Sequence, residues 1–271
     1  MTAVPGQLIH SLAFRQLSTR TEKNTMKKPL FTTAVALFAT VALTTPSFIA
    51  PTPARAQATT AQTRPLPFDS IAGRGGIIRI TPIIHGSIQI EYRGKVILVD
   101  PISAGTYRKK ADVILITHPH GDHLDLPAIA RTLKPNANRT AGGQVYAPAS
   151  VLPAIRTIRG IKASSLNAGT TTSYQLPEGS RYNWFIQFQT VPMYNVVRGP
   201  RPGEKYHPKE SRWNGYILTL GGKRIYIAGD TEATPEMKAL KNIHAAFIPM
   251  NLPYTMTPQE AAVGVRAFRP R

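Results

Sequence analysis

The sequence predicts an α/β sandwich, and three observations support this prediction. Runs of apolar and β-branched residues, such as 77–84 and 184–191, have the composition of strands. Residues 126–133 place apolar side chains at helical spacing. Strand-like and helix-like segments alternate along the chain, as they do where helices cover sheets. With 271 residues, the chain is long enough for one domain of roughly 200 to 250 residues.

The first half of this domain should contain several strands and one helix. We expect strands over 77–84, 87–92, 96–101 and 113–117, with tight turns at 85–86 and 93–95. A helix should follow over 126–133, because Asp125 has the residue type of an N-cap and Pro127 lies in the first turn. We therefore interpret Asp125 as a helix cap.

The second half continues the alternation of strands and helices. We expect strands over 145–147, 161–166, 173–176, 184–191, 215–220, 223–228 and 244–250, and helices over 148–158, 235–240 and 258–268. Gly221-Gly222 between two of these strands is typical of a hairpin. The segment Thr257-Pro258-Gln259-Glu260 has the pattern of a capped helix start.

Residues 1–56 are expected to lie outside the folded domain. A basic start at 26–28 precedes an apolar run over 30–43, and Ala54-Arg55-Ala56 has the small residues of a cleavage site. These are the three parts of a secretory signal peptide. We therefore expect translation to start at Met26, with an upstream extension before it, and cleavage to follow Ala56.

This interpretation predicts a protein exported to the periplasm or the extracellular space. The apolar run is short for a membrane span, so we expect no stable transmembrane anchor, although an uncleaved anchor is the alternative. Residues 57–76 are rich in Gln, Thr, Pro and Gly and are interpreted as a linker. The folded domain should then comprise residues 77–271.

The composition limits the classes of partner and of metal ligand. The chain has no cysteine, so neither disulfides nor thiolate ligands are available to it. After residue 56, 27 Lys and Arg face 13 Asp and Glu, which gives a formal net charge of +14. This charge favours a small anionic substrate or another anionic partner. The basic residues are scattered, however, so a basic secreted surface is preferred to a specific nucleic-acid site.

Three of the seven histidines follow the predicted strand 113–117 within a few residues. His118, His120, Asp122 and His123 alternate with Pro119 and Gly121, which exclude a regular helix there. Imidazole nitrogens and carboxylate oxygens bind divalent ions at about 2.0 to 2.2 Å. Gathering four such groups without an ion would leave polar atoms and like charges unsatisfied. We therefore prefer a metal site to the alternative of an exposed polar loop.

The stretch Thr-His-Pro-His-Gly-Asp-His also resembles the H-x-H-x-D-H motif of the metallo-β-lactamase superfamily of metallohydrolases. This resemblance implies a four-layer αββα sandwich with a two-metal site at one edge of its sheets. It further implies that His118 and His120 hold a first metal, and that Asp122 and His123 hold a second. Gly229-Asp230-Thr231 after a predicted hairpin resembles the motif in which an aspartate bridges both metals, so Asp230 is the expected bridging ligand.

The chain also departs from the pattern of that superfamily. The strand that should deliver a third histidine ends in Tyr194-Asn195, as it does in some lactonase-like relatives. His207 lies in the following loop, where we expect it to meet substrate as a lid residue. His85, Tyr194 and Asn195 are further candidates for substrate contact, with a structural role for His85 as the alternative. The final strand and its histidine have no counterpart before Arg271, so we expect the sandwich to be C-terminally incomplete. Either the sequence is a fragment of a longer reading frame, or it is complete and its activity is impaired.

The resemblance implies hydrolysis by a metal-activated water. The expected substrate is an ester, lactone or phosphoester, and the expected cofactor is a pair of divalent ions, with zinc favoured and manganese or iron as alternatives. Asp122 is expected to hold the second metal and to orient the water. The alternatives are a secreted binding protein that has lost catalysis, and a phosphodiesterase that acts on lipid or nucleic acid.

Overall fold

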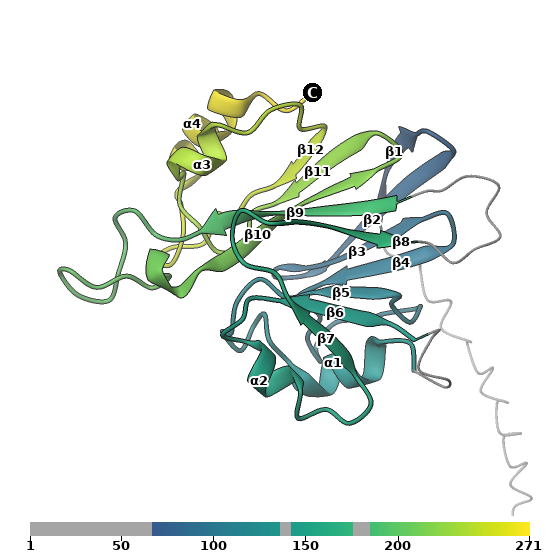
Figure 1. The fold of residues 1–271 in the computed structure, drawn as a ribbon. Helices are drawn as coiled ribbons and strands as arrows, with labels where there is room; N and C mark the ends of the chain where they lie inside the picture. Colours follow the sequence, from purple (N-terminus) through teal and green to yellow (C-terminus); the bar gives the residue numbers. More distant parts are fainter. Residues whose placement is uncertain (1–66, 136–141, 176–184) are drawn as a thin grey trace, which may run out of the picture. The chain divides into compact units, whose positions relative to one another are not determined.

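The computed structural model describes residues 67–135, 142–175 and 185–271, and it contains two β-sheets (Figure 1). The signal peptide, the start at Met26 and the first ten residues of the expected linker lie outside the described residues. The first sheet has its strands in chain order: β1 (Asp69–Gly73), β2 (Gly76–Ile84), β3 (Ser87–Tyr92), β4 (Lys95–Val99), β5 (Val113–Leu115), β6 (Gln144–Ala147) and β7 (Lys162–Ser165).

The strands of the first sheet change direction midway. Strands β1 to β4 are antiparallel neighbours joined by tight turns. Strands β4 to β7 are parallel neighbours, so the chain crosses over the face of the sheet between them. The carboxyl ends of β4, β5 and β6 consequently lie at one edge of the sheet, which is where the histidine-rich loop begins.

The second sheet is mostly antiparallel. Its strands are β8 (Thr171–Gln175), β9 (Phe185–Met193), β10 (Trp213–Leu220), β11 (Lys223–Ile227) and β12 (Ala245–Phe247). Their order is β12-β11-β10-β9-β8, and only β12 runs parallel to its neighbour β11. Because β9 and β10 are antiparallel, the end of β9 and the start of β10 lie together, and the segment 194–212 connects them.

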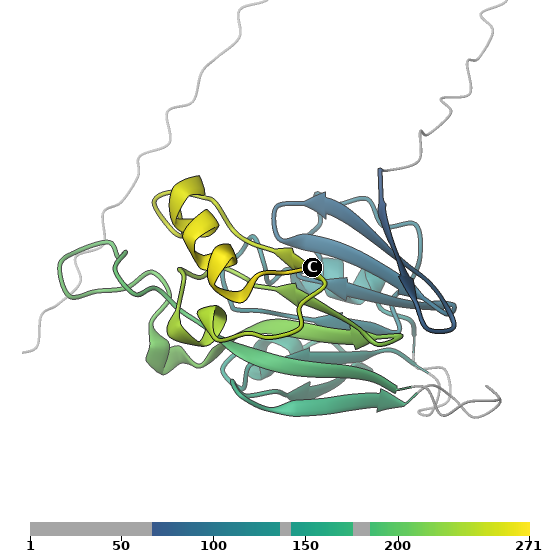
Figure 2. The same cartoon turned by 90° about the horizontal axis from the view of Figure 1, so that it is seen from above.

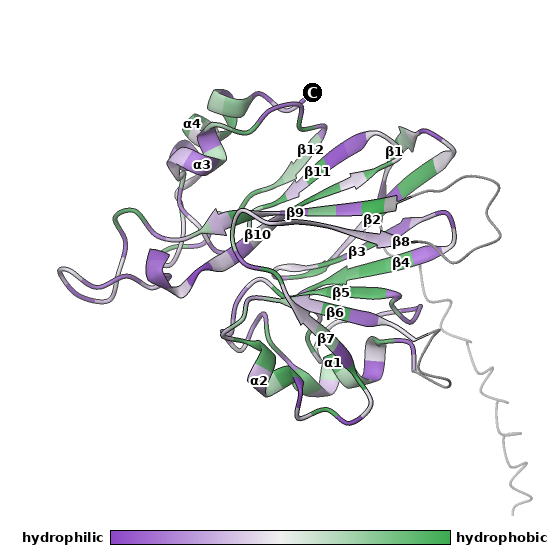
Figure 3. Ribbon diagram, viewed as in Figure 1, coloured by the Kyte–Doolittle hydropathy of each residue, from purple (hydrophilic) through white to green (hydrophobic). Residues whose placement is uncertain are grey.

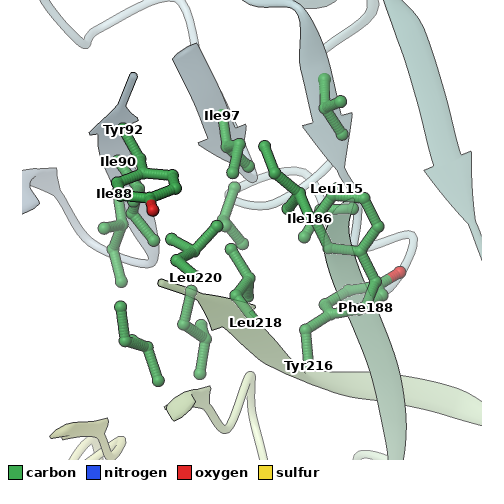
Figure 4. Packing of buried hydrophobic residues seen from close by; sticks show 14 of the residues in the cluster. Ile88, Ile90, Tyr92, Ile97, Leu115, Ile186, Phe188, Tyr216, Leu218 and Leu220 are labelled. Carbon is green, nitrogen blue, oxygen red and sulfur yellow. The ribbon is translucent and has the colours of Figure 1, made fainter. Parts of the chain in front are cut away.

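The main hydrophobic core lies between the two sheets. Ile88, Ile90 and Ile97 from the first sheet belong to the same buried cluster as Phe188 and Leu218 from the second (Figure 4). Aliphatic side chains are frequent along β4 and β5, as the hydropathy colouring shows (Figure 3). Burial on both faces explains why these central strands are nearly continuous apolar runs.

Helices cover the outer face of each sheet. Helices α1 (Leu126–Thr132) and α2 (Leu152–Ile155) pack on the first sheet through a second cluster that contains Leu98, Ile114 and Ile129. Helices α3 (Pro235–Lys238) and α4 (Pro258–Phe268) pack on the second sheet through a third cluster, and α4 is the yellow helix in Figure 2. The order of layers is therefore helix, sheet, sheet, helix, as the resemblance implied.

The expected helix caps are confirmed. Asp125 Oδ1 accepts a hydrogen bond of 2.8 Å from Ala128 N at the start of α1. Thr257 and Glu260 form a reciprocal capping box at the start of α4. None of the helices within the described ranges has the length and apolar character needed to traverse a lipid bilayer.

Several predicted segments are longer than the elements observed, such as 244–250 against β12, and two segments differ more strongly. The folded part begins before residue 77, because β1 pairs with β2 through a turn in which Gly75 has a φ of 80°. The predicted linker therefore contains a strand, anchored where Ile71 packs against the main core. The helix predicted over 148–158 is limited to α2, which begins at Leu152 without a side-chain cap.

Candidate metal centre

The loop after β5 brings three histidines together. His118 is fully buried, His123 is buried, and His120 is exposed at the surface. The ring centroids of His118 and His120 lie 4.7 Å apart, and those of His118 and His123 lie 4.1 Å apart. The sequence-predicted histidines therefore converge, because β5 ends at the sheet edge and Pro119 and Gly121 keep the loop irregular.

A fourth histidine joins them from the second sheet. The ring centroid of His207 lies 5.1 Å from that of His118 and 4.9 Å from that of His120. The side chain of His207 is buried beside these rings, and its expected role as a lid residue that meets substrate stays a prediction. The ring is buried because the segment 194–212 folds back over the β5 loop, where Asn195 binds both the backbone and the ring of His207.

The buried histidines present unpartnered nitrogens. Among the described residues, Nε2 of His118 and Nε2 of His207 are buried without a hydrogen-bond partner. Such atoms are costly unless something binds them. The ligand atoms of His118, His120 and His207 lie within 4.8 Å of one another, and those of His118, His123 and Asp230 do too. Both groups could hold an ion, and imidazole with carboxylate is a donor set that divalent transition metals accept.

The hydrogen bonds of Nδ1 fix the tautomers of these rings. Thr117 Oγ1 donates to Asp100 Oδ2 over 2.5 Å, so the same hydroxyl accepts from Nδ1 of His118 at 2.9 Å. Nδ1 of His123 donates to Asp100 Oδ2 over 2.7 Å. Each Nδ1 therefore carries a proton, and each Nε2 is directed to the site as the ligand atom.

Asp100 organises this side of the centre. Its carboxylate is buried and accepts hydrogen bonds from Thr117 N, Thr117 Oγ1 and His123 Nδ1, at 2.7, 2.5 and 2.7 Å. Its backbone φ is 43°, a left-handed conformation in which short polar residues are more tolerated than bulky ones. The strained backbone of Asp100, directly after β4, therefore allows its carboxylate to bind both Thr117 and His123.

Asp230 and Asp122 approach the same volume. Asp230 Oδ1 lies 3.4 Å from His123 Nε2, and its other oxygen lies 3.7 Å from His207 Nε2. Asp122 is half-exposed and lies 3.8 Å from His123 Nε2. Gly229, with a φ of 63°, lets β11 turn into Asp230, because a Cβ there would lie 2.5 Å from Met193 Sδ.

The histidines differ in their affinity for protons. Burial lowers the pKa of His118 well below its usual value, with a further decrease from the neighbouring histidines, and burial lowers the pKa of His207 to about 4. Burial also opposes the charged form of His123, but the hydrogen bond and charge of Asp100 and Asp230 outweigh it and raise the pKa to about 10. Burial raises the pKa of Asp230, yet His123 and the other histidines bring it below its usual value. His118 and His207 are thus neutral and ready to bind an ion.

The other candidate site residues have different surroundings. Tyr194 donates from its hydroxyl to Glu236 Oε2 over 2.8 Å and accepts from Lys209. Asn195 is buried and contacts His207, so it supports the centre instead of facing open solvent. His85 is exposed, with a φ of 47°, in the turn between β2 and β3.

A cavity of about 410 Å³ adjoins the centre. It is lined by Asp122, His123 and Asp230 on one side and by His85 in the β2–β3 turn. Most of its remaining wall is apolar, with Pro82, Ile88, Ile227, Phe247, Ile248 and Met250. Of the described residues that line it, none is Lys or Arg, so the positive charge of the chain is not concentrated there.

Several residues of the centre were not identified from the sequence. His207 was assigned to substrate contact, and Asp100 and Thr117 were not considered as supports for the ligands. One signal was available: Asn195 stands where a histidine was expected, and His207 is the nearest histidine in the loop that follows. Asn195 and His207 are 12 positions apart in the chain, so the sequence alone does not reveal the hydrogen bond between them.

Fold and site together define an α/β sandwich with a histidine- and aspartate-rich centre at one sheet edge. Known proteins resemble this chain in sequence and in fold. A family model described as the β-lactamase superfamily domain matches residues 91–271. A UPF0173 metal-dependent hydrolase of Geobacillus thermodenitrificans is 30% identical over 194 residues, which cover 66% of this chain and 76% of the relative. A counterpart from Shouchella clausii is 32% identical over 191 residues, or 65% and 75% of the two chains.

Two solved structures are also similar to this chain. A protein of Parabacteroides distasonis to which metal-dependent hydrolase activity is attributed is 40% identical, with a TM-score of 0.62 over 76% of this chain and 84% of that one. The metallohydrolase Igni18 of Ignicoccus hospitalis is 21% identical, with a TM-score of 0.51 over 71% and 79%, and shares the fold. The chain belongs to the β-lactamase superfamily, among its metal-dependent hydrolases.

Proposed function

We propose that the centre holds two divalent ions. His118, His120 and His207 would bind the first, and His123 with Asp230 would bind the second, with Asp122 at its rim. The observation that carries this proposal is the pair of buried, unpartnered Nε2 atoms of His118 and His207, which point to a bound cation. Nitrogen and oxygen ligands suit zinc, with manganese or iron as alternatives.

When bound, such ions polarise a substrate oxygen and lower the pKa of bound water, so that hydroxide is available near neutral pH. The protein residues supply orientation. Asp100 holds His123 by its Nδ1, and Asn195 holds His207 by its Nδ1. Asp122 is half-exposed at the cavity and is proposed to accept a hydrogen bond from the attacking water, which directs it at the substrate.

The proposed reaction is hydrolysis of an ester or a lactone. The cavity beside the centre has a mainly apolar wall and no lysine or arginine among its described lining residues. An uncharged acyl or lactone group fits such a wall, whereas the charged oxygens of a phosphoester would find no lysine or arginine there to pair with, apart from the ions themselves. We therefore favour a carbonyl substrate over the phosphoester alternative and over the anionic substrate suggested by net charge.

The alternative of a binding protein without catalysis was based on the lack of a third imidazole at the first metal and on the missing final strand. His207 lies where it could supply that imidazole, which weakens the first of these two reasons. Among the described residues, no cluster of basic side chains lines the cavity. The cavity therefore gives no support to a phosphodiesterase that acts on nucleic acid.

The function is tested by metal content together with a hydrolysis panel. Purified protein should contain close to two ions per chain, and should hydrolyse neutral esters or lactones in preference to phosphodiesters and β-lactams. His120→Ala should abolish turnover. His244→Ala is the control, because His244 Nδ1 accepts a hydrogen bond from Arg224 N and lies in no candidate metal group of the described residues. A metal content near zero after reconstitution would refute the proposal.

We also propose that residues 26–56 direct export, on the strength of their basic start, apolar run and Ala54-Arg55-Ala56. Expression of the full chain with its native start should give a product whose amino terminus is Gln57. Mass spectrometry of the secreted or periplasmic fraction measures this, and a terminus far upstream of Gln57 would contradict it.

A further inference from the structure

A buried carboxylate outside the expected ligand set holds the loop that carries His207. Glu232 lies two residues after Asp230 and is 4% exposed. Its Oε2 accepts hydrogen bonds from Val196 N at 3.0 Å and Val197 N at 2.7 Å, and its Oε1 accepts one from Arg198 N at 2.8 Å. Three consecutive backbone donors thus converge on one carboxylate, which fixes the start of the 196–206 loop.

The same carboxylate contacts Asn195. Asn195 Nδ2 donates to Glu232 Oε1 over 3.3 Å and to the Tyr254 carbonyl over 2.8 Å. The orientation of this amide is determined by its neighbours, because the backbone N–H of His207 can only donate and lies 2.7 Å from the other end of the amide. That end is therefore the oxygen, Oδ1.

The orientation of Asn195 decides the tautomer of His207. The same Oδ1 lies 2.8 Å from Nδ1 of His207, so Nδ1 must carry the proton. Nε2 then keeps its lone pair and is the buried atom without a partner. Reversing the amide would place an NH₂ group against two donors, and Glu232 and the Tyr254 carbonyl both oppose this reversal.

We propose that Glu232 is a positioning residue for the metal centre, which sets the place and the tautomer of His207 through Asn195 and the start of the 196–206 loop. This inference rests on the proposed role of His207 in binding an ion. Glu232 touches neither the ion nor the substrate in this scheme. It acts in the way that outer hydrogen-bond partners orient metal-binding histidines in other proteins.

A simple ion pair with Arg198 does not account for Glu232. The guanidinium of Arg198 makes its two short contacts, of 2.9 and 2.7 Å, to Glu260, and its contact with Glu232 is longer, at 3.4 Å. Glu260 therefore provides a matched control, since it binds the same arginine and makes none of the bonds to Asn195 or to the loop backbone. Glu260→Gln also preserves the capping residue type of α4.

The test compares Glu232→Gln, Asn195→Ala and Glu260→Gln in the full chain. Glutamine at 232 places an NH₂ group against backbone donors, and alanine at 195 removes the link to His207 while leaving the three backbone bonds of Glu232 in place. Both should weaken cobalt(II) binding at the three-histidine site by about 10- to 100-fold. Glu260→Gln should bind cobalt like the parent protein.

A second readout is independent of metal and activity. Nitrogen-15 NMR of the metal-free protein should show His207 protonated at Nδ1 in the parent and in Glu260→Gln, and a mixture of tautomers in Asn195→Ala and Glu232→Gln. If Glu232→Gln keeps the Nδ1–H tautomer and the parent affinity, the inference is overturned, whatever Asn195→Ala shows. If the parent itself binds no cobalt, the proposed function fails, and the tautomers still decide the role of Glu232.

Discussion

At the scale of single residues, the centre depends on carboxylates that act through histidines. Asp100 illustrates this, because one buried carboxylate binds Thr117 and His123, and Thr117 in turn binds His118. The proposed ligands of both ions therefore share one support. Losing it should alter metal binding although Asp100 belongs to neither candidate metal group of the described residues.

We predict that Asp100→Asn weakens metal binding by about 10- to 100-fold, because His123 loses its anionic acceptor. Titration of the metal-free protein with zinc or cobalt measures the change. Asp112→Asn is the matched control, since Asp112 is also buried and accepts a bond from Val96 N, with Lys95 and Lys134 as ion partners. It should lower stability and leave metal affinity within about twofold; equal losses in both variants would contradict the prediction.

The pKa of His123 predicts a proton release. Its pKa is raised to about 10, so the metal-free protein carries a proton on both ring nitrogens at pH 7. An ion that binds Nε2 must displace one proton, and apparent affinity should rise about tenfold per pH unit between pH 7 and 9. His207, with a pKa of about 4, contributes no proton there. Calorimetry in buffers of different ionisation enthalpy should detect about one proton released, and a value of zero would refute this assignment.

At the scale of elements, the turn between β2 and β3 forms part of the wall around His123. A Cβ added to Gly86 would lie 2.7 Å from His123 Cε1. We predict that Gly86→Ala displaces the ring and weakens metal binding by at least tenfold. Metal titration and denaturant unfolding together separate a local effect from a loss of fold.

Gly121→Ala is the comparison for that substitution. Gly121 lies between proposed ligands, yet a Cβ there would meet nothing within 4 Å, and its φ is outside the positive region. Metal affinity should stay near that of the parent, and stability should change by less than about 0.5 kcal/mol. A large loss in Gly121→Ala with none in Gly86→Ala would show that the packing around His123 is not the deciding factor.

The elements show what the sequence could and could not predict. Strands such as β3, β5 and β10 were predicted because their apolar patterns match the burial of the sheets. Helix α4 was predicted because Thr257 and Glu260 cap it locally. The strand β1 was missed because its stability comes from pairing with β2, which composition does not reveal. The approach of His207 to the other histidines was not predicted for a similar reason: its contacts with Asn195 and His118 depend on how a loop folds back.

At the scale of the whole domain, the centre joins two sheets. His118, His120 and His123 follow β5 of the first sheet, whereas His207 and Asp230 belong to connections of the second. Tyr216 of β10 reinforces this junction by donating from its hydroxyl to the Ile116 carbonyl over 2.6 Å. An ion shared by these ligands therefore binds only the folded domain.

We predict that metal removal destabilises the protein. Ions at about 100 times their dissociation constant add about 2.7 kcal/mol per site to the folded state. For a domain of this size the corresponding loss is roughly 5 to 10 °C in Tm per site. Calorimetry before and after chelation measures the shift, and restoring zinc should reverse it. His207→Ala should retain only part of the shift, and an unchanged Tm in the parent protein would contradict the proposed sites.

The connection between β9 and β10 has a buried base and an exposed outer part. Its base is tied down, at Asn195 by Glu232 and at His207 by Asn195, while Val197 and Arg201 lie exposed farther out. Insertions or deletions around Pro200 and Pro202 would reshape the outer surface without moving the imidazole. The sequence of this outer segment can therefore vary while the buried residues at its base keep their arrangement.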